Sequence, residues 1–451
     1  MKRERLGSRL GFILLSAGCA IGIGNVWKFP YMVGQNGGGI FVLLYILSLV
    51  LFGVPIMTVE FALGHASQKS PVKMFQALQK PKQKWHLYGY VCMLGNYVLL
   101  MFYTTVSGWM LYYLYASITG KYISMNNVEV EKLFESLLAN PTTQIFCLAI
   151  IIIVGFVILG RGLQKGLEKI TKIMMVSLLI LMIILAINSI FLKGGKEGLI
   201  FYLKPDLQQM QKVGLANVAI AALTQAFFTL SVGIGAMAIF GSYIDKKQAL
   251  LGESMIISVL DTMVAFSAGL IIFPACMAFG VDVNSGPKLL FITLPNVFNS
   301  LPFGQLWGSL FFLFMVFAAF STVLAVSENI VSCCMDLFGW NRKKACLINT
   351  IIIFIISLPC ALGFNVLSHI QPFGAGSNIL DLEDFILSNI LLPLGSMVFL
   401  IFCVSRYGMG WKRFMEEANT GKGLKVKNWM YYYAKYVLPV IVLLIFIVNL
   451  K

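Results

Sequence analysis

The sequence predicts an all-α polytopic membrane protein with about eleven transmembrane helices, and three observations support this fold class. Hydrophobic residues make up 59% of the 451 residues and charged residues only 12%, whereas about a quarter of a soluble domain is charged. Mean hydropathy is +0.84. Apolar runs long enough to cross ~30 Å of hydrocarbon recur along the chain. Polar interruptions delimit eleven expected spans, at residues 8–35, 39–64, 87–117, 143–160, 167–192, 215–242, 251–280, 304–336, 346–366, 382–405 and 431–450.

The basic residues indicate how these spans are oriented. If the N-terminus is cytoplasmic, Lys and Arg concentrate in every alternate loop, in agreement with the positive-inside rule. Topology therefore explains the net charge of +15, and we expect no nucleic-acid partner. The cytoplasmic segments would carry Lys2, Arg3, Arg5, Lys69, Lys73, Lys80, Lys82, Lys84, Arg161, Lys165, Lys246, Lys247, Arg342, Lys343, Lys344, Arg406, Lys412, Arg413, Lys422, Lys425 and Lys427.

The cysteines and the first residues of the chain limit other interpretations. Most of the nine cysteines fall within expected spans and no pair lies in the expected outer loops, so we expect no structural disulfide. The three histidines lack metal-ligand spacing. The start KRER, followed by LGFILLSAGC, also resembles a bacterial lipoprotein signal with Cys19 as the lipidated residue. Ser16 within that signal and the ten spans that follow it argue against lipidation.

Two expected spans are interrupted by small and polar residues. The first interruption is GCAIGIGN, residues 18–25, and the second is TQAFFTLSVGIGAM, residues 224–237. Irregular backbone survives in a membrane only beside a cavity or other protein. Each interruption opens a block of five spans, which is the pattern of an inverted-repeat transporter with a site near the bilayer midplane. Close helix packing is the competing explanation for the glycines.

The chemistry of such a break favours small zwitterionic ligands. An unwound helix exposes carbonyl oxygens that can replace the water around a cation. The helix that restarts presents free N–H groups and its positive dipole end to a carboxylate. One broken span can therefore bind a cation and the acidic end of an amino acid together.

Polar side chains in other spans support the same prediction. Ser321 and Thr322 follow Ala318 by three and four residues, so both hydroxyls can lie near the Ala318 carbonyl, although such hydroxyls often only bond their own helix. Asp261 lies inside the apolar seventh span, where an ionisable group is costly and usually functional. For Glu60 we favour a structural role, in which it accepts hydrogen bonds from backbone amides freed at a break.

The stretch RLGFILLSAGCAIGIGNVWKFPYMVGQNGGGIF resembles the first-span signature of the neurotransmitter:sodium symporter family, in its bacterial amino-acid transporter branch. The resemblance continues through PIMTVEFALG, FYTTVSGW, QAFFTLSVGIGA, FITLP, FAAFST and LDLEDF, and covers spans one to ten. It implies one transmembrane domain with the leucine-transporter fold. Residues 1–192 and 215–405 would be inverted five-helix repeats whose first helices, the first and sixth of the chain, are unwound. Residues 431–450 would add a helix, and the protein would lie in the bacterial inner membrane.

The resemblance also implies two sodium sites and one amino-acid site. The first sodium ion would bind Ala20, Asn25, Thr229 and Asp261, and the second Gly18, Ile21, Ala318, Ser321 and Thr322. The amino acid would contact Cys19, Ala20, Ile23, Gly24, Leu99, Tyr103, Phe228, Thr229, Ser231, Ile234, Thr322 and Val326. Phe228 and Tyr103 would form a lid over it.

Two charged pairs are implied as gates. Lys28 and Asp384 would form the outer pair, and Arg3 with Asp336 the inner pair near Ser242 and Tyr243. The alternative is that these residues are ordinary charges at the membrane surface and form no gate. This alternative applies most to Arg3, because its basic neighbours could take the same role. Lys28 replaces an arginine of the family, and because lysine lacks the bidentate fork we expect a looser latch.

Gly22, Asp261 and the apolar pocket positions indicate which substrate and which ions the protein would bind. Gly22 stands where monoamine transporters carry an aspartate, so the resemblance favours an amino acid over an amine. Asp261 is a fixed anion near Tyr45, Gln225 and Thr229, while Ala265 is neutral, and we therefore expect no chloride requirement. The apolar pocket positions favour a hydrophobic side chain, and Ile234, in place of a common aromatic ring, leaves room for an aromatic one.

The sequence does not favour two other classes of membrane protein, channels and enzymes. A channel needs a continuous pore, and the sequence shows no repeated filter motif. An enzyme needs a catalytic constellation, and no Ser–His–Asp, metal or paired-carboxylate pattern is visible. We therefore expect a transporter and not an enzyme. Its ligands would be Na⁺ and an amino acid, with no organic cofactor and no obligate protein partner besides the lipid bilayer.

Overall fold

The computed structural model describes residues 4–192, 194–278 and 289–449, and every regular element in these ranges is helical. The segments labelled η are π-helical turns that continue into neighbouring α-helices. The first half contains α1 (Arg9–Ala20), η1 (Gly24–Lys28), α2 (Phe29–Gln35), α3 (Gly39–Ser48), η2 (Leu49–Gly53), α4 (Val54–Ser67), α5 (Pro71–Leu78), α6 (His86–Ile118), α7 (Asn127–Ala139), α8 (Pro141–Gly160), η3 (Leu163–Glu168) and α9 (Lys169–Ile190).

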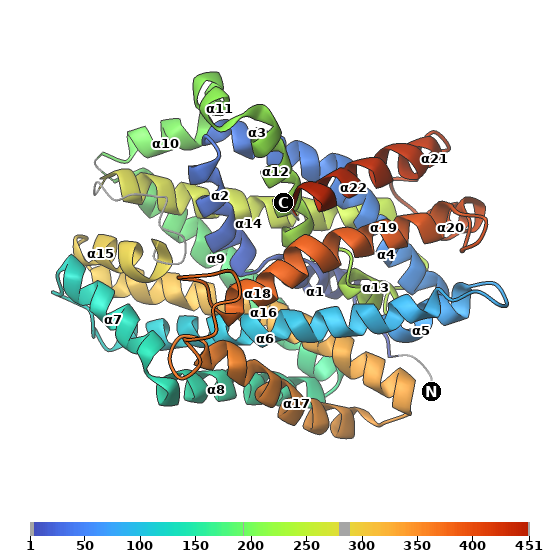
Figure 1. Ribbon diagram of the computed structural model, residues 1–451, viewed down its shortest axis with the longest axis horizontal. Coiled ribbons are helices and arrows are strands. Elements are labelled where there is room, and N and C mark those ends of the chain that lie inside the picture. Colours follow the sequence, from blue (N-terminus) through green and yellow to red (C-terminus); the bar gives the residue numbers. More distant parts are fainter. Residues whose placement is uncertain (1–3, 193, 279–288, 450–451) are drawn as a thin grey trace.

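The second half of the chain supplies the remaining helices. They are α10 (Lys196–Leu203), α11 (Leu207–Val213), α12 (Leu215–Thr229), α13 (Ala236–Gly241), α14 (Leu250–Ala278), η4 (Leu289–Thr293), α15 (Leu294–Asn299), α16 (Gly304–Phe338), α17 (Arg342–Leu362), α18 (Ile379–Phe385), η5 (Ile386–Leu391), α19 (Leu392–Val404), α20 (Trp411–Ala418), α21 (Met430–Tyr432), η6 (Tyr433–Val437) and α22 (Leu438–Asn449). In Figure 1, α6 and α16 run through the middle of the molecule, with α8 and α17 below them and α3 and α12 above.

The helices agree with the expected membrane spans. Within the described ranges, nine helices are long and apolar enough to cross a membrane, and α1 with the η1–α2 helix makes a tenth, bent by 54°. The sixth expected span consists of two shorter helices, α12 and α13, which are separated by residues 230–235. The ends of the seventh and eleventh expected spans lie partly outside the described residues. The prediction of a polytopic all-α protein is confirmed, and the count of eleven stays a prediction.

Both predicted interruptions are breaks in the helical backbone. Helix α1 ends at Ala20, and Ile21 adopts an extended conformation with φ −70° and ψ 107°. The second break contains three residues with positive φ: Ser231 at 51°, Gly233 at 102° and Gly235 at 72°. Glycine adopts such angles without steric cost, whereas serine does so less readily. The glycine spacing therefore explains where the sixth span unwinds.

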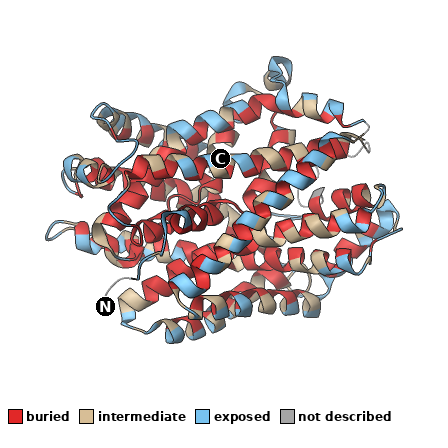
Figure 2. Cartoon of the chain, turned by 180° about the vertical axis from the view of Figure 1, so that it is seen from behind, coloured by how far each residue is buried: buried red, intermediate tan, exposed pale blue. Residues whose placement is uncertain are grey.

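The broken helices lie in the interior, and the long apolar helices surround them. Every residue of α1 from Gly11 to Ala20 is buried, and Figure 2 shows buried positions through the centre of the bundle. Exposed apolar side chains such as Leu47, Ile153, Ile183 and Leu443 lie on outward faces of their helices. Such faces suit lipid, because lipid tails are as apolar as these side chains.

Candidate functional site

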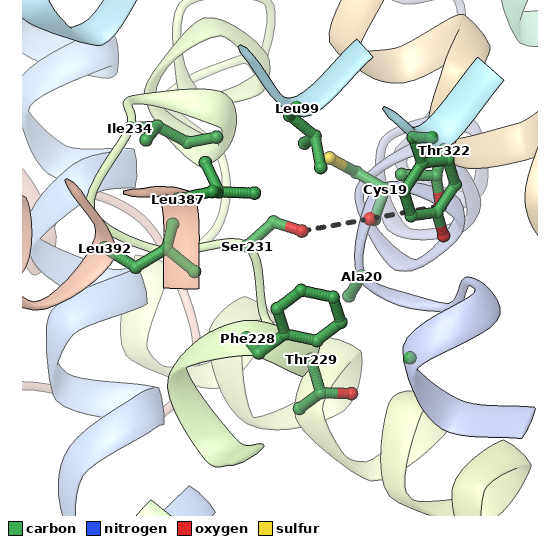
Figure 3. Close-up of a pocket in the computed structure, with 12 residues that line it drawn as sticks. Cys19, Ala20, Leu99, Phe228, Thr229, Ser231, Ile234, Thr322, Leu387 and Leu392 are labelled. Atoms are coloured by element: carbon green, nitrogen blue, oxygen red, sulfur yellow. Dashed lines mark hydrogen bonds between the residues drawn. The ribbon is translucent and has the colours of Figure 1, made fainter. Parts of the chain in front are cut away.

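The two breaks meet at the centre of the molecule. The Ser231 hydroxyl donates to the Cys19 carbonyl at 3.3 Å, which joins the second break to the first (Figure 3). The Gln225 amide in α12 donates to the Gly24 carbonyl at 3.1 Å. Segments about 200 residues apart in sequence thus form one polar site, as an inverted-repeat transporter requires.

A buried carboxylate organises the first group of predicted ligands. Asp261 in α14 accepts a hydrogen bond from the Asn25 amide at 2.8 Å and from the Thr229 hydroxyl at 3.0 Å. Tyr45 donates to the same carboxylate at 3.4 Å. The Asn25 side-chain oxygen accepts from the Gly22 amide at 3.0 Å. All these side chains are buried, so the three side chains predicted for the first sodium site lie together beside the first break.

A pair of hydroxyls organises the second group. The Ser321 hydroxyl lies 3.0 Å from the Ala318 carbonyl and 3.4 Å from the Ile21 carbonyl. The Thr322 hydroxyl lies 3.3 Å from the Gly18 carbonyl and 3.2 Å from that of Ile21. The five residues predicted for the second sodium site therefore converge. Carbonyl and hydroxyl oxygens from the first break and from α16 meet there, and oxygen atoms are the ligands that hard cations prefer.

A small cavity borders both groups, since Thr229 of the first group and Thr322 of the second line it (Figure 3). Its free volume is about 20 Å³, less than an amino-acid side chain occupies, so this pocket has to widen for a substrate. Ten of its twelve lining residues were predicted: Cys19, Ala20, Gly24, Leu99, Tyr103, Phe228, Thr229, Ser231, Ile234 and Thr322. The two that the sequence did not indicate are Leu387 in η5 and Leu392 in α19.

Two predicted pocket residues lie elsewhere. Ile23 lines the outer vestibule, and its amide donates to the Tyr103 hydroxyl at 2.7 Å. Val326 is buried within α16 but does not line the cavity. The contact expected between the Ile23 amide and the substrate carboxylate, and that expected between Val326 and the substrate side chain, therefore stay predictions. Leu387 and Leu392 instead close the apolar wall beside Ile234, as Figure 3 shows.

Buried polar side chains hold the second break in its irregular form. The Gly233 amide donates to the Glu60 carboxylate of α4, and the Tyr88 hydroxyl donates to the Gly233 carbonyl at 3.1 Å. The Asn96 amide donates to the Ile234 carbonyl at 3.0 Å, and the Asn329 amide donates to the side-chain oxygen of Asn96 at 3.1 Å. These partners satisfy backbone groups that lost their helical bonds, as buried polar groups require. The contact expected of Glu60 is present.

The outer pair of charges is in contact. The Lys28 ammonium lies 3.1 Å from the Asp384 carboxylate and 3.9 Å from the centre of the Phe228 ring. The same cation therefore touches both the predicted outer latch and the predicted lid. Beyond this contact lies a vestibule of about 550 Å³, which Trp27, Phe364 and residues of α18 help to line.

The inner side contains a larger ionic network than the sequence indicated. Arg342 pairs with Glu328 at 2.6 Å and with Glu4 at 3.1 Å. The predicted inner residue Tyr243 donates to Glu328 at 2.7 Å. Asp336 accepts from the Ser70 amide at 2.7 Å, and its predicted partner Arg3 lies outside the described residues. Glu328 and Arg342 were not predicted because an acid 14 residues before an arginine has no distinctive spacing.

A second ionic cluster ties α20 to the bundle. Glu417 lies 2.6 Å from the His65 imidazole and 3.2 Å from the Lys246 ammonium. The hydrogen bond from His65, with the positive charge of Lys246, lowers the pKa of the Glu417 carboxyl, although partial burial opposes the shift. The cluster thus connects three segments at one end of the molecule.

Two broken helices expose carbonyl oxygens, and a closed pocket lies between two ionic networks. These features are those of an ion-coupled membrane transporter. The comparisons agree with this class. A model of the sodium:neurotransmitter symporter family matches residues 3–127 and 122–451. The chain therefore belongs to this family of sodium-dependent, multi-pass membrane transporters.

Individual relatives cover nearly the whole chain. The sodium-dependent transporter YhdH of Bacillus subtilis is 32% identical over 448 residues, which are 99% of this chain and 97% of that protein. The sodium-dependent transporter MJ1319 of Methanocaldococcus jannaschii is 34% identical over 98% of this chain and 89% of that protein. The crystal structure of MhsT in complex with L-phenylalanine matches with a TM-score of 0.88 at 37% identity, over 99% of both chains. The predicted leucine-transporter-like fold is thereby confirmed.

Proposed function

We propose that the protein is a symporter that couples sodium to the uptake of a neutral, hydrophobic or aromatic amino acid by alternating access. The observation that carries this proposal is the apolar cavity that borders two clusters of oxygen atoms at paired helix breaks. A sodium-dependent family supports the ion. We expect the protein in a bacterial inner membrane with its N-terminus in the cytoplasm, because basic residues concentrate in the corresponding loops.

Two sodium ions fit the donor sets. Asn25, Thr229 and Asp261, with the Ala20 carbonyl, would hold the first ion, where Asp261 supplies a full negative charge. The carbonyls of Gly18, Ile21 and Ala318, with the Ser321 and Thr322 hydroxyls, would hold the second. Carbonyl, hydroxyl and carboxylate oxygens are the ligands that hard cations prefer. Binding of the amino acid beside the first ion would raise the affinity of each for the other, because such coupling is reciprocal.

The substrate carboxylate would lie near the Tyr103 hydroxyl and the amides after the first break. An ideal Cβ on Gly22 would overlap with the Tyr103 hydroxyl, so the site leaves no space for a protein carboxylate there. The acidic group must then come from the substrate, which favours an amino acid over an amine. The Ser231 hydroxyl and the carbonyls of Ala20, Phe228 and Thr229 would receive the amino group.

The side-chain part of the pocket is apolar. Cys19, Leu99 and Ile234 form it together with Leu387 and Leu392. None of these side chains could pair with a charged substrate side chain, which would be costly to bury alone. The MhsT structure, which contains L-phenylalanine, supports an aromatic or large aliphatic substrate.

We further propose that transport does not require chloride. Asp261 already places a negative charge within hydrogen-bonding distance of Asn25, Thr229 and Tyr45. A second anion in the same buried place would be repelled, because like charges interact strongly at low dielectric. Replacement of chloride by gluconate at constant sodium should leave uptake unchanged.

The gates would alternate around this site. The contact between Lys28 and Asp384 would close the outer side, and the contacts among Tyr243, Glu328 and Arg342 would close the inner side. Residues 1–192 and 215–405 would be the two inverted repeats, and 431–450 the additional helix. The membrane potential would contribute ~2.3 kcal/mol per charge per 100 mV to sodium-driven uptake.

The proposal is tested by binding and by transport. Purified protein should bind a subset of the twenty amino acids only when sodium is present, with potassium as the control cation. In proteoliposomes, the same amino acids should accumulate against their gradient while an inward sodium gradient exists. Accumulation that persists after this gradient is collapsed would refute coupling. Ion currents far larger than the substrate flux would indicate a channel instead.

A further inference from the structure

A buried acid that the proposed transport cycle does not use lies next to the outer gate. Glu383 occupies the position before Asp384 in α18, and it is 4% exposed. Among the residues that the structure describes, neither of its carboxylate oxygens has a hydrogen-bond partner. Buried acids are rare in membrane proteins, and those that exist usually pair or serve a function.

Within the part of the chain that the structure describes, Glu383 forms no ion pair, and the nearby Lys28 ammonium is paired with Asp384. The thiol of Cys360 in α17 contacts the carboxyl group, and Thr105 of α6 contacts the same thiol. From its own helix, Asp384 is engaged by Lys28 and Ser388, and Asp381 accepts from the Asn378 amide. Neither neighbouring acid supplies a positive partner for Glu383, and the charge of Asp384 is already compensated by Lys28.

The surroundings of Glu383 determine which protonation state costs less free energy. Within the described ranges, no group of three or more His, Cys, Asp or Glu side chains is placed to hold a metal ion. A lone carboxylate in this place would bear an uncompensated desolvation cost. A carboxylic acid avoids this cost because it is neutral, and its proton can be shared with a weak acceptor such as a thiol.

We propose that Glu383 is a proton-binding site, which holds a proton while the outer gate is closed and returns it to the outer solution when the gate opens. In this structure the gate is closed, since Lys28 contacts Asp384. Leu380, Asp381 and Asp384 line the outer vestibule from the same helix. Any movement of α18 that separates Lys28 from Asp384 also changes the packing around Glu383 and admits water from the vestibule.

The proposal predicts how external pH shifts the equilibrium between the open and the closed outer gate. Closure takes up one proton from the vestibule and opening releases it there, so no proton crosses the membrane. Acidic external solution should therefore favour the closed gate, whereas alkaline external solution should oppose closure by up to tenfold per pH unit. The pH inside the cell should have no effect through this group.

Infrared spectroscopy tests the protonation without any knowledge of the substrate. The difference spectrum of wild-type protein minus Glu383→Gln should contain the carbonyl stretch of a protonated carboxylic acid. This band should persist above about pH 6, where an ordinary glutamate has lost its proton. Its absence above that pH would overturn the proposal. Glu383→Met, also neutral and similar in size, provides a second reference if the Gln variant folds poorly.

Transport measurements test the coupling to the gate. In oriented proteoliposomes, wild-type uptake should fall severalfold as external pH rises from about 6 to 8.5, and luminal pH should not matter. Glu383→Gln should flatten this dependence, because the amide is always neutral. The exposed acid Glu135 in α7 supplies the control variant Glu135→Gln, which should keep the wild-type profile. An unchanged profile in Glu383→Gln, or a dependence on luminal pH, would refute the coupling.

Discussion

Replacement of Asp261 by asparagine removes a full charge from the first proposed sodium site and changes little else. The side chain keeps its size, and the amide oxygen can still accept one of the hydrogen bonds now made by Asn25 and Thr229. Tyr45, which lies 3.4 Å away, loses a charged acceptor and keeps a neutral one. The substitution therefore isolates the contribution of the negative charge.

The expected loss can be worked from this geometry. Unit charges ~4 Å apart attract with about 4 kcal/mol at an effective dielectric of 20, and direct ligands are closer. The ion also loses water on binding, and relief of the buried carboxylate returns part of the energy. A net loss of about 2–4 kcal/mol corresponds to roughly 30- to 1,000-fold weaker sodium binding. Tyr45→Phe, which keeps the charge, should cost less than about tenfold.

Sodium titrations of amino-acid binding measure this loss directly. They should be run in chloride and in gluconate, with Asp261→Asn, Tyr45→Phe and wild-type protein side by side. If Asp261 replaces a chloride ion, the Asn variant should regain part of its sodium affinity in chloride, and the wild type should be indifferent. Wild-type sodium affinity in Asp261→Asn would refute the assignment, as would loss of wild-type binding in gluconate.

Three other substitutions test separate parts of the structure. Ser321→Ala should weaken sodium binding about tenfold in the same titrations, because one of several oxygen ligands is lost. Gly22→Ala should weaken amino-acid binding more than about 100-fold, since its Cβ overlaps with the Tyr103 hydroxyl. Glu417→Gln should lower stability by about 1 kcal/mol at neutral pH. The contact with His65 depresses the pKa of Glu417, so this stabilisation is present above about pH 4.3 and disappears as the pH falls further. Thermal unfolding across pH would contradict this if the wild-type and variant curves stayed apart in acid.

The sequence predicted those parts of the site in which residues depart from the composition of an ordinary membrane-spanning helix. Glycines and an amide inside an apolar span are incompatible with an ordinary lipid-facing helix, so Gly18 to Asn25 indicated a break from composition alone. Asp261 was visible for the same reason, as a charge within hydrocarbon. An acidic side chain inside an apolar span is so unusual that the residue type alone indicates a functional position.

The remaining features depend on tertiary packing and have no local signature. In the sequence, Leu387 and Leu392 resemble lipid-facing leucines. In the structure they line the pocket from the π-helical turn η5 and from the first residue of α19. Val326 has the expected residue type, but it is buried in α16 and is not among the residues that line the cavity. The contact between Glu328 and Arg342 joins the buried interior of α16 to the first residue of α17. The sequence of charges does not indicate which acid the arginine contacts.

Lys28 links features that the sequence suggested separately. Its ammonium lies 3.1 Å from Asp384 and 3.9 Å from the centre of the Phe228 ring, so one cation is held by the latch and by the lid. A lysine can satisfy both because its charge is a compact point, whereas the planar fork of arginine favours a bidentate carboxylate. In the proposed cycle, movement of Phe228 over a substrate would therefore change the energy of the Lys28–Asp384 contact directly. The lid and the outer gate would then be coupled through one side chain, and a substrate that displaces the Phe228 ring would also shift the balance between the open and the closed gate.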